Sequence, residues 1–227
     1  MQKERKIITY QEIAAIPSSE IKESLVDVRK YEPSIITQYE KNDMFPYTGE
    51  RIFVRDTVAR KLAIANRALA KNGKFRFRVV YGYRHPDIQE EYFKQKRTDI
   101  QKSNPSLNDE ELDTLTHNFI AVPSVAGHPT GGAIDITIVD AAGNDFDMGT
   151  QIVDFENIEK IKTFAKGLSN KQKRNRLFLC DILVREGFAP FYGEWWHFSY
   201  GDLEWACFYG KKKSIYSPLK FKLTQKN

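Results

Sequence analysis

The stretch that decides the fold reads Gly131-Gly132-Ala133-Ile134-Asp135-Ile136-Thr137-Ile138-Val139. Its polar residues alternate with isoleucines, so a β-strand here would place the isoleucines on one face and Asp135 and Thr137 on the other. We expect the isoleucine face to belong to the core. A carboxylate in the middle of such a strand costs free energy if it is buried without a partner. Asp135 therefore requires a cation, a hydrogen-bond network or a metal, unless its face of the strand is open to solvent.

Outward from this strand, helical and strand patterns alternate without regularity. Apolar residues recur every three or four positions over 51–72 and predict a helix, and the alternating pattern over 75–81 predicts a second strand. Further elements are expected as helices at 87–96, 108–114, 158–166 and 171–186 and as an aromatic strand at 194–200. No glycine-rich nucleotide-binding motif is present in the sequence. This order favours an α+β fold over a doubly wound parallel sheet.

Length and composition exclude several classes of protein. The chain has 227 residues, 41% of them hydrophobic, so it can bury a core and lacks the composition of a disordered chain. No apolar run approaches the ~18 residues of a transmembrane helix, and residues 1–13 lack the apolar region of a signal peptide. Two cysteines, Cys180 and Cys207, cannot form a disulfide framework. These features predict a soluble cytoplasmic protein without a membrane partner.

Positive charge is concentrated near the C-terminus. Lys and Arg total 35 against 30 Asp and Glu, a net charge of +5. Six lysines and no acidic residue lie in 211–227, which leaves 29 basic and 30 acidic residues in the remainder. A basic segment can bind nucleic acid, but this balance does not suggest the basic face that such a protein needs. We predict one domain over 1–210, a solvated basic tail over 211–227 and no nucleic-acid partner.

Three further positions carry side chains suited to metal or acid–base chemistry. His128 lies in a stretch with three glycines and a proline, seven residues before Asp135. Glu194 and His197 lie in the most aromatic part of the chain, with two tryptophans between them. Two histidines and one aspartate form a three-ligand set of the kind that catalytic zinc uses, which leaves one position for water. A glutamate three residues from a ligand can act as the general base for that water.

Strand periodicity sets a condition on this candidate site. On a regular strand over 194–200, Glu194 and His197 would lie on opposite faces. They can serve one site only if the chain bends near Gly193. The alternative is an amphipathic strand whose polar residues face water. For His128, the alternative is an ordinary surface residue of a loop. The His-Glu-x-x-His motif is absent from the sequence, so the helix-based zinc peptidase arrangement is excluded.

Arg84 is the fourth candidate. It follows the predicted strand over 75–81 at a turn into a helix, where a guanidinium can neutralise negative charge that develops on an oxyanion. His85 is an alternative metal ligand, but it precedes Pro86 and has no partner at a recognisable spacing.

Together these segments resemble the D-alanyl-D-alanine dipeptidases, a zinc peptidase family that includes the vancomycin-resistance dipeptidases. The family is related to D,D-carboxypeptidases and to the hedgehog signalling domain. The resemblance rests on three ordered motifs, which here read Gly82-Tyr83-Arg84 with Pro86, then His128-Pro129-Thr130-Gly131-Gly132-Ala133-Ile134-Asp135, then Glu194-Trp195-Trp196-His197. It implies a single α+β domain with a central antiparallel sheet.

The resemblance also implies roles for these residues. His128, Asp135 and His197 would bind one zinc ion per chain. Glu194 would be the general base and later the proton donor, and Arg84 would steady the tetrahedral intermediate. The implied activity is hydrolysis of D-Ala-D-Ala or a similar D-amino-acid dipeptide.

Two departures from the family pattern concern the substrate. Ala126 stands where the family has a serine, two positions before the first zinc histidine. The family segment that holds the substrate ammonium matches 148–155 only with one extra residue, which makes Asp154 the best candidate for that role. Two alternatives therefore stay open, a D,D- or L,D-carboxypeptidase acting on peptidoglycan stem peptides and a zinc-containing binding module without catalysis. The lack of a signal peptide argues against the first, and the presence of Glu194 and Arg84 argues against the second.

Overall fold

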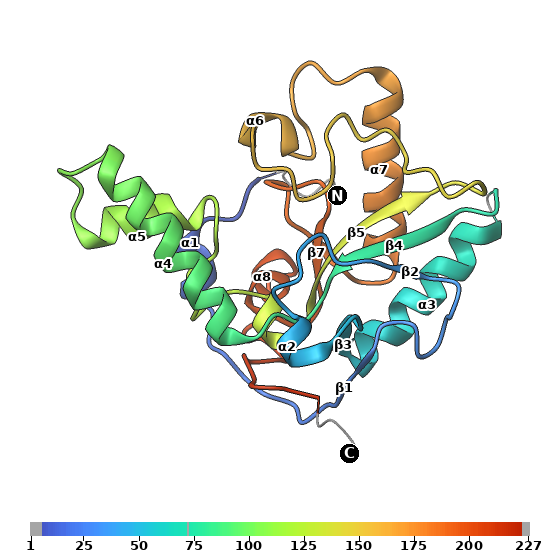
Figure 1. Ribbon diagram of the computed structural model, residues 1–227, viewed down its shortest axis with the longest axis horizontal. Helices are drawn as coiled ribbons and strands as arrows, with labels where there is room; N and C mark the ends of the chain where they lie inside the picture. Colours follow the sequence, from blue (N-terminus) through green and yellow to red (C-terminus); the bar gives the residue numbers. More distant parts are fainter. Residues whose placement is uncertain (1–5, 72, 224–227) are drawn as a thin grey trace.

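A five-stranded sheet lies at the centre of the computed structural model, which describes residues 6–71 and 73–223 (Figure 1). The strand order is β2-β4-β5-β7-β6, and every neighbouring pair is antiparallel except β2 and β4, which run parallel. The strands are β2 (Ile36–Thr37), β4 (Arg76–Tyr81), β5 (Ala133–Val139), β6 (Ala189–Pro190) and β7 (His197–Ser199). The predicted α+β domain with a central sheet flanked by helices is confirmed, and its antiparallel order is broken by that one parallel pair.

Helices lie on two sides of this sheet. Two long helices, α3 (Asp56–Lys71) and α7 (Asn170–Arg185), contact each other beside the strands, while α4 (Pro86–Ser103) and α5 (Asp109–His117) form a hairpin that projects from the other side (Figure 1). The remaining elements are α1 (Tyr10–Ala14), β1 (Leu25–Asp27), α2 (Phe45–Thr48), β3 (Phe53–Arg55), the 3-10 turn η1 (His128–Thr130), α6 (Ile158–Ile161) and α8 (Leu203–Phe208). None of the helices within the described ranges combines the length and hydropathy that a membrane span requires.

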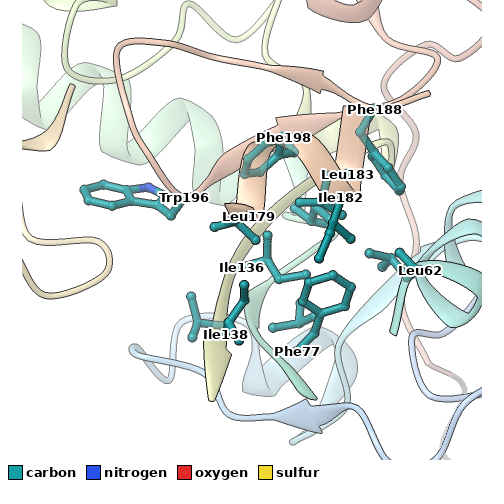
Figure 2. Close-up of a cluster of buried hydrophobic side chains, with 14 of the residues drawn as sticks. Leu62, Phe77, Ile136, Ile138, Leu179, Ile182, Leu183, Phe188, Trp196 and Phe198 are labelled. Carbon is teal, nitrogen blue, oxygen red and sulfur yellow. The ribbon is translucent and has the colours of Figure 1, made fainter. Parts of the chain in front are cut away.

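Strand β5 is buried on both faces. Ile134, Ile136 and Ile138 are fully buried in the main hydrophobic core, as expected from their alternation. Figure 2 shows this face packed with side chains from β4, β7, α3 and α7, among them Phe77, Phe198, Leu62, Leu179 and Leu183. Asp135 and Thr137 on the opposite face are only 4% and 1% exposed. The alternative of a solvent-facing Asp135 is therefore excluded.

Several predicted boundaries differ from the structure. The helix expected at 158–166 ends at Ile161, and the helix expected at 108–114 runs from Asp109 to His117. The helix expected over 51–72 begins only at Asp56, because residues 53–55 pair with β1 as strand β3. The helix expected at 87–96 continues to Ser103, and Arg97 in that extension forms ion pairs of 2.6 Å with Asp109 and Asp113 of the α5 segment. The aromatic strand is shortened to β7, since the chain turns before it.

The basic C-terminal segment lies against the body as far as Leu223. The backbone N–H of Leu219 donates to Pro129 O at 3.0 Å, and that of Phe221 donates to the Tyr83 hydroxyl at 2.9 Å. Apolar residues of the segment pack beside Phe53 and Tyr83. The part of the predicted tail beyond Leu223 lies outside the described residues. The part of this segment up to Leu223 is therefore not a solvated tail. Its apolar residues Leu219, Phe221 and Leu223 alternate with lysines, so one side of the segment packs on the body.

A buried arginine holds the loop that follows β5. Arg176 of α7 is fully buried and donates to three carbonyl oxygens, to Met148 at 2.7 Å, to Lys160 at 3.0 Å and to Lys162. Burial lowers the pKa of this guanidinium to about 10. Residues 148–162 are thereby fixed to α7, and this loop contributes one wall of the cavity described below.

We expect Arg176→Met to lower the free energy of unfolding by roughly 3 kcal/mol, because three buried carbonyls lose their donor. Arg174→Met on the exposed side of the same helix is the matched control and should change stability by less than about 0.5 kcal/mol. Urea denaturation followed by circular dichroism measures both. Equal stability of the two variants would contradict the role assigned to Arg176.

Candidate metal centre and active site

Sheet register brings the central carboxylate next to a histidine. Asp135 of β5 is paired with Tyr81 of β4 on one side and with His197 of β7 on the other. Cross-strand neighbours of this kind have side chains on the same face of the sheet. His197 Nδ1 accordingly lies 3.0 Å from Asp135 Oδ1.

The second histidine comes from the turn before β5. His128 begins η1, and its carbonyl accepts a hydrogen bond of 3.2 Å from the backbone N–H of Arg84. The turn ends at Gly131, whose φ of 73° is the left-handed conformation that glycine adopts without strain. His128 Nε2 reaches within 3.3 Å of Asp135 Oδ2. The structure thus brings His197 together with His128 and Asp135, which precede it in the sequence by more than sixty residues.

These three side chains have the chemistry and spacing of a metal site. His128 Nδ1 lies 2.8 Å from Gly82 O, a carbonyl that can only accept, so Nδ1 carries a proton. In the neutral ring, His128 Nε2 then carries a lone pair that faces Asp135 Oδ2. Both atoms are hydrogen-bond acceptors, so this contact is unfavourable unless a cation lies between them. One donor atom from each of the three residues lies within 4.8 Å of the others. A tetrahedral zinc with bonds of ~2.0–2.1 Å spaces its ligand atoms ~3.3 Å apart, so the residues fit a zinc ion.

Electrostatics favour an ionised carboxylate at Asp135 and a neutral imidazole at His128, whereas His197 favours the charged imidazole and must lose a proton when a metal binds. Burial works against the ionised form of Asp135, but the contacts with His128 and His197 outweigh it and hold the pKa of the carboxyl well below its usual range. Burial lowers the pKa of His128. Both directions are those required of metal ligands, which bind as carboxylate and neutral imidazole.

Glu194 reaches the same cavity because the chain bends. The backbone N–H of Glu194 donates to Phe191 O at 3.1 Å and that of His197 donates to Glu194 O at 3.2 Å, so consecutive turns replace the first half of the predicted strand. On a regular strand Glu194 and His197 would point to opposite faces, but these turns bring both side chains to the same cavity. The bend that the sequence analysis set as a condition is therefore present. Burial raises the pKa of the Glu194 carboxyl to about 7, a value suited to taking up and releasing a proton near neutral pH.

The two tryptophans hold this bend in place. Trp195 and Trp196 are 2% and 0% exposed. Trp195 donates from Nε1 to Thr150 Oγ1 at 2.9 Å, and the Trp196 ring meets Phe155 edge-on at 5.5 Å between centroids. Both contacts are with the loop that Arg176 fixes to α7, so the position of Glu194 depends on that loop.

Arg84 is oriented by a frame of side chains. Its guanidinium carbon lies 4.3 Å from the centre of the Tyr81 ring, and its Nη1 donates to Gln89 Oε1 at 2.8 Å. The hydroxyls of Tyr81 and Tyr92 both donate to Asp43 Oδ2. The buried Nε of Arg84 has no hydrogen-bond partner among the described residues. These contacts fix the direction of the Arg84 side chain, and its Nε–H remains available to donate a hydrogen bond to a ligand.

Glu204 is a site residue that the sequence analysis did not identify. It lies in the first turn of α8 and is 8% exposed, with Oε2 at 3.5 Å from His197 Nε2. Burial disfavours the charged imidazole, but Glu204 and Asp135 outweigh it and raise the pKa of His197 well above its usual range. A carboxylate on the far nitrogen orients a metal-binding histidine. The only sequence signal would have been an acidic residue seven positions after His197.

One cavity of about 950 Å³, measured with its mouth, joins these groups. The residues that line it include Arg84, Ala126, His128, Asp135, Glu194, His197 and Glu204. Asp154 does not line it, although its neighbours Val153 and Phe155 do, and Asp154 Oδ1 accepts the backbone N–H of Glu156 at 3.0 Å. His85 lies outside the cluster, where its Nδ1 accepts the Asp87 backbone N–H and its ring stacks on Tyr47.

Fold and site together define an α+β domain with a buried His/Asp/His cluster beside a carboxyl group and a guanidinium. The chain belongs to the D-ala-D-ala dipeptidase family of the peptidase M15 type, whose model matches residues 34–214. The resemblance stated from the motifs is confirmed.

Curated relatives with the name D-alanyl-D-alanine dipeptidase match parts of the chain. The protein from Synechocystis sp. is 34% identical over 123 residues, 47% of this chain and 50% of the relative. The Escherichia coli protein is 36% identical over 32% of this chain and 37% of the relative, and the Enterococcus faecalis protein 32% identical over 42% and 46%. The chain spans about half the length of the curated relatives it matches.

Solved structures with similar folds include peptidases. A mutant of the vancomycin resistance D,D-pentapeptidase VanY in complex with zinc has a TM-score of 0.41 at 18% identity, over 72% of this chain and 82% of that chain. The LdcB LD-carboxypeptidase has a TM-score of 0.49 at 18% identity, over 85% of this chain and 77% of that chain.

We expect Asp135→Asn to reduce zinc affinity by about 100-fold or more, because a neutral amide replaces the one anionic donor of the cluster. His85→Asn, outside the cluster, is the control and should bind zinc as the native protein does. Competition with a chromogenic chelator measures affinity, and circular dichroism verifies that both variants fold. Native affinity in Asp135→Asn would remove this cluster as the metal site.

Proposed function

We propose that this protein is a zinc-dependent dipeptidase that hydrolyses D-Ala-D-Ala or a similar D-amino-acid dipeptide, with one zinc ion per chain. The observation that carries the proposal is that Glu194, Arg84 and the His/Asp/His cluster line one cavity. Membership of the family and the names of the curated relatives support the substrate class. The partner of the site is then a small dipeptide.

His128, Asp135 and His197 would hold the metal. Bound there, zinc would supply Lewis-acid activation of the scissile carbonyl and of the attacking water. The hydrogen bond from His128 to Gly82 O and the contact of His197 with Glu204 fix the ring orientations that present a lone pair to the ion.

Glu194 would carry the proton. Its carboxylate accepts a proton from the water that attacks the peptide carbon and then donates it to the nitrogen of the leaving D-amino acid. The proton of the water thus reaches the leaving amine, and the carboxylate is regenerated. The backbone turns from Phe191 to His197, held by the buried Trp195 and Trp196, keep this group in one position through both transfers.

Arg84 would stabilise the negative charge that develops on the carbonyl oxygen. Tyr81 and Gln89 hold its guanidinium in place before substrate arrives, so little reorganisation is needed when the charge forms. Its unpartnered Nε gives the donor for this contact.

We expect Glu194→Gln to lower kcat for D-Ala-D-Ala by about 100-fold or more while zinc stays bound, since an amide cannot accept the proton. The control is Glu186→Gln, which lies at the end of α7 outside the cavity lining. Turnover is measured by release of free D-alanine and zinc by elemental analysis, which also tests the stoichiometry of one ion per chain. Near-native turnover would show that Glu194 is not the base.

A second measurement separates the dipeptidase from the two alternatives. We expect kcat/KM for D-Ala-D-Ala to exceed that for a pentapeptide stem ending in D-Ala-D-Ala by at least about 100-fold, because only the free dipeptide carries a charged amine next to the scissile bond. Preferential cleavage of the pentapeptide would favour a carboxypeptidase. Binding of either peptide without hydrolysis would favour a binding module.

A further inference from the structure

Residues 217–223 lie outside the region that the family's model matches, yet they contact two turns that carry site residues. The Tyr83 hydroxyl donates to Leu219 O at 2.8 Å and accepts the backbone N–H of Phe221 at 2.9 Å. The backbone N–H of Leu219 donates to Pro129 O at 3.0 Å. One short segment is thus bonded both to the turn after β4 and to the turn η1.

Tyr83 is held to this segment in one position. Its side chain is fully buried, and its ring lies 5.9 Å from the Phe221 ring between centroids. Burial raises the pKa of the Tyr83 hydroxyl to about 12, so the hydroxyl keeps its proton and remains a donor at neutral pH. Because a buried polar group that loses its partner costs free energy, movement of Tyr83 away from the segment is disfavoured.

The residues on either side of Tyr83 make contacts inside the site. Gly82 O lies 2.8 Å from His128 Nδ1, the contact that fixes the ring of this candidate ligand. Arg84 donates from its backbone N–H to His128 O at 3.2 Å, and its side chain lines the cavity. Pro129, the other residue bonded to the segment, directly follows His128. A shift of either bonded turn would therefore move both the imidazole and the guanidinium.

A buried arginine ties the same segment to the end of η1. Arg55 is 1% exposed and donates from Nε to Thr130 O at 2.6 Å and from Nη2 to Ser217 O at 3.2 Å. Glu20, which pairs with Arg55 Nη1 at 2.9 Å, also accepts the backbone N–H of Ser217 at 2.8 Å. The segment is thereby anchored at its first residue as well as beside Tyr83, which fixes both its position and its direction.

We propose that residues 217–223 form a clamp that positions His128 and Arg84 relative to each other, acting through Pro129 and Tyr83. No residue of this segment lines the cavity, so its residues are positioning residues. A ligand ring and an oxyanion donor held at a fixed separation need little reorganisation when metal and substrate bind. The inference deepens the proposed function and rests on it where turnover is concerned, whereas the effect on metal binding requires no substrate.

The first test removes the hydroxyl that bonds to the clamp. In Tyr83→Phe we expect zinc affinity to fall by about 10-fold, and kcat for D-Ala-D-Ala to fall by about 10-fold while KM stays within about twofold of native. Tyr209→Phe is the matched control, because it also removes a hydroxyl that donates to a backbone carbonyl, Phe188 O at 3.0 Å, outside the cavity lining. Competition with a chromogenic chelator measures affinity, and release of D-alanine measures turnover.

The second test alters the clamp without altering either turn. Phe221→Ala removes the ring that packs beside Phe53 and Tyr83, and we expect zinc affinity to fall by about 10-fold here as well. The visible absorption of the cobalt-substituted protein, which reports the geometry of the metal ligands, should change in both variants. Lys222→Ala, at the exposed neighbouring position, is the control and should behave as the native protein does. Combining Tyr83→Phe with Phe221→Ala should add little, because both act through one contact.

Other outcomes overturn the proposal. Native zinc affinity and a native cobalt spectrum in either Tyr83→Phe or Phe221→Ala would leave the segment a role in stability alone, even if urea unfolds the variant more easily. Equal losses in Tyr83→Phe and Tyr209→Phe, or losses that multiply in the double variant, would also contradict a single clamp. If the native protein binds zinc and hydrolyses no peptide, the dipeptidase function fails, while the metal measurements still decide whether the clamp exists.

Discussion

One buried carboxylate between two imidazoles is the contact on which the rest of the site depends. Asp135 lies in the central strand β5 with almost no exposure to solvent, and a buried anion is stable only with partners. His197 reaches it through strand pairing and His128 through the turn that precedes β5. The positions of β7 and of that turn are therefore tied to a single side chain, and a cation between the three groups would satisfy them all.

The two faces of β5 separate the hydrophobic core from the candidate site. Its isoleucine face packs against the side that carries α3 and α7, which makes the strand rigid. Its polar face opens on a cavity whose other walls come from α4, α8 and the loop held by Arg176. Helix α4 supplies Gln89 and Tyr92 around the Arg84 guanidinium, and α8 supplies Glu204 beside the His197 ring. The candidate site thus depends on the packing of elements that lie far apart in the sequence.

Local patterns predicted those parts of the fold that local forces determine. The alternation over 131–139 predicted strand β5, and the helix expected at 171–186 lies within one residue of α7, because both segments have strong periodicity and a glycine or turn at one end. Boundaries failed where long-range pairing intervened, as in the conversion of residues 53–55 to strand β3 by β1. The roles of Asp43 and Glu204 could not be predicted, since their contacts with Tyr92 and His197 follow from packing rather than from a motif.

By itself the sequence determined the α+β class, the central strand, and the set of side chains able to bind a metal and move a proton. Strand periodicity also showed that Glu194 and His197 can serve one site only if the chain bends between them. Only the tertiary structure decided that this bend exists, that Asp135 is buried, and that Asp154 stays outside the cavity while Glu204 lies within it. The physical reason is that residue type and periodicity are local properties, whereas burial and distance between side chains depend on how the whole chain packs.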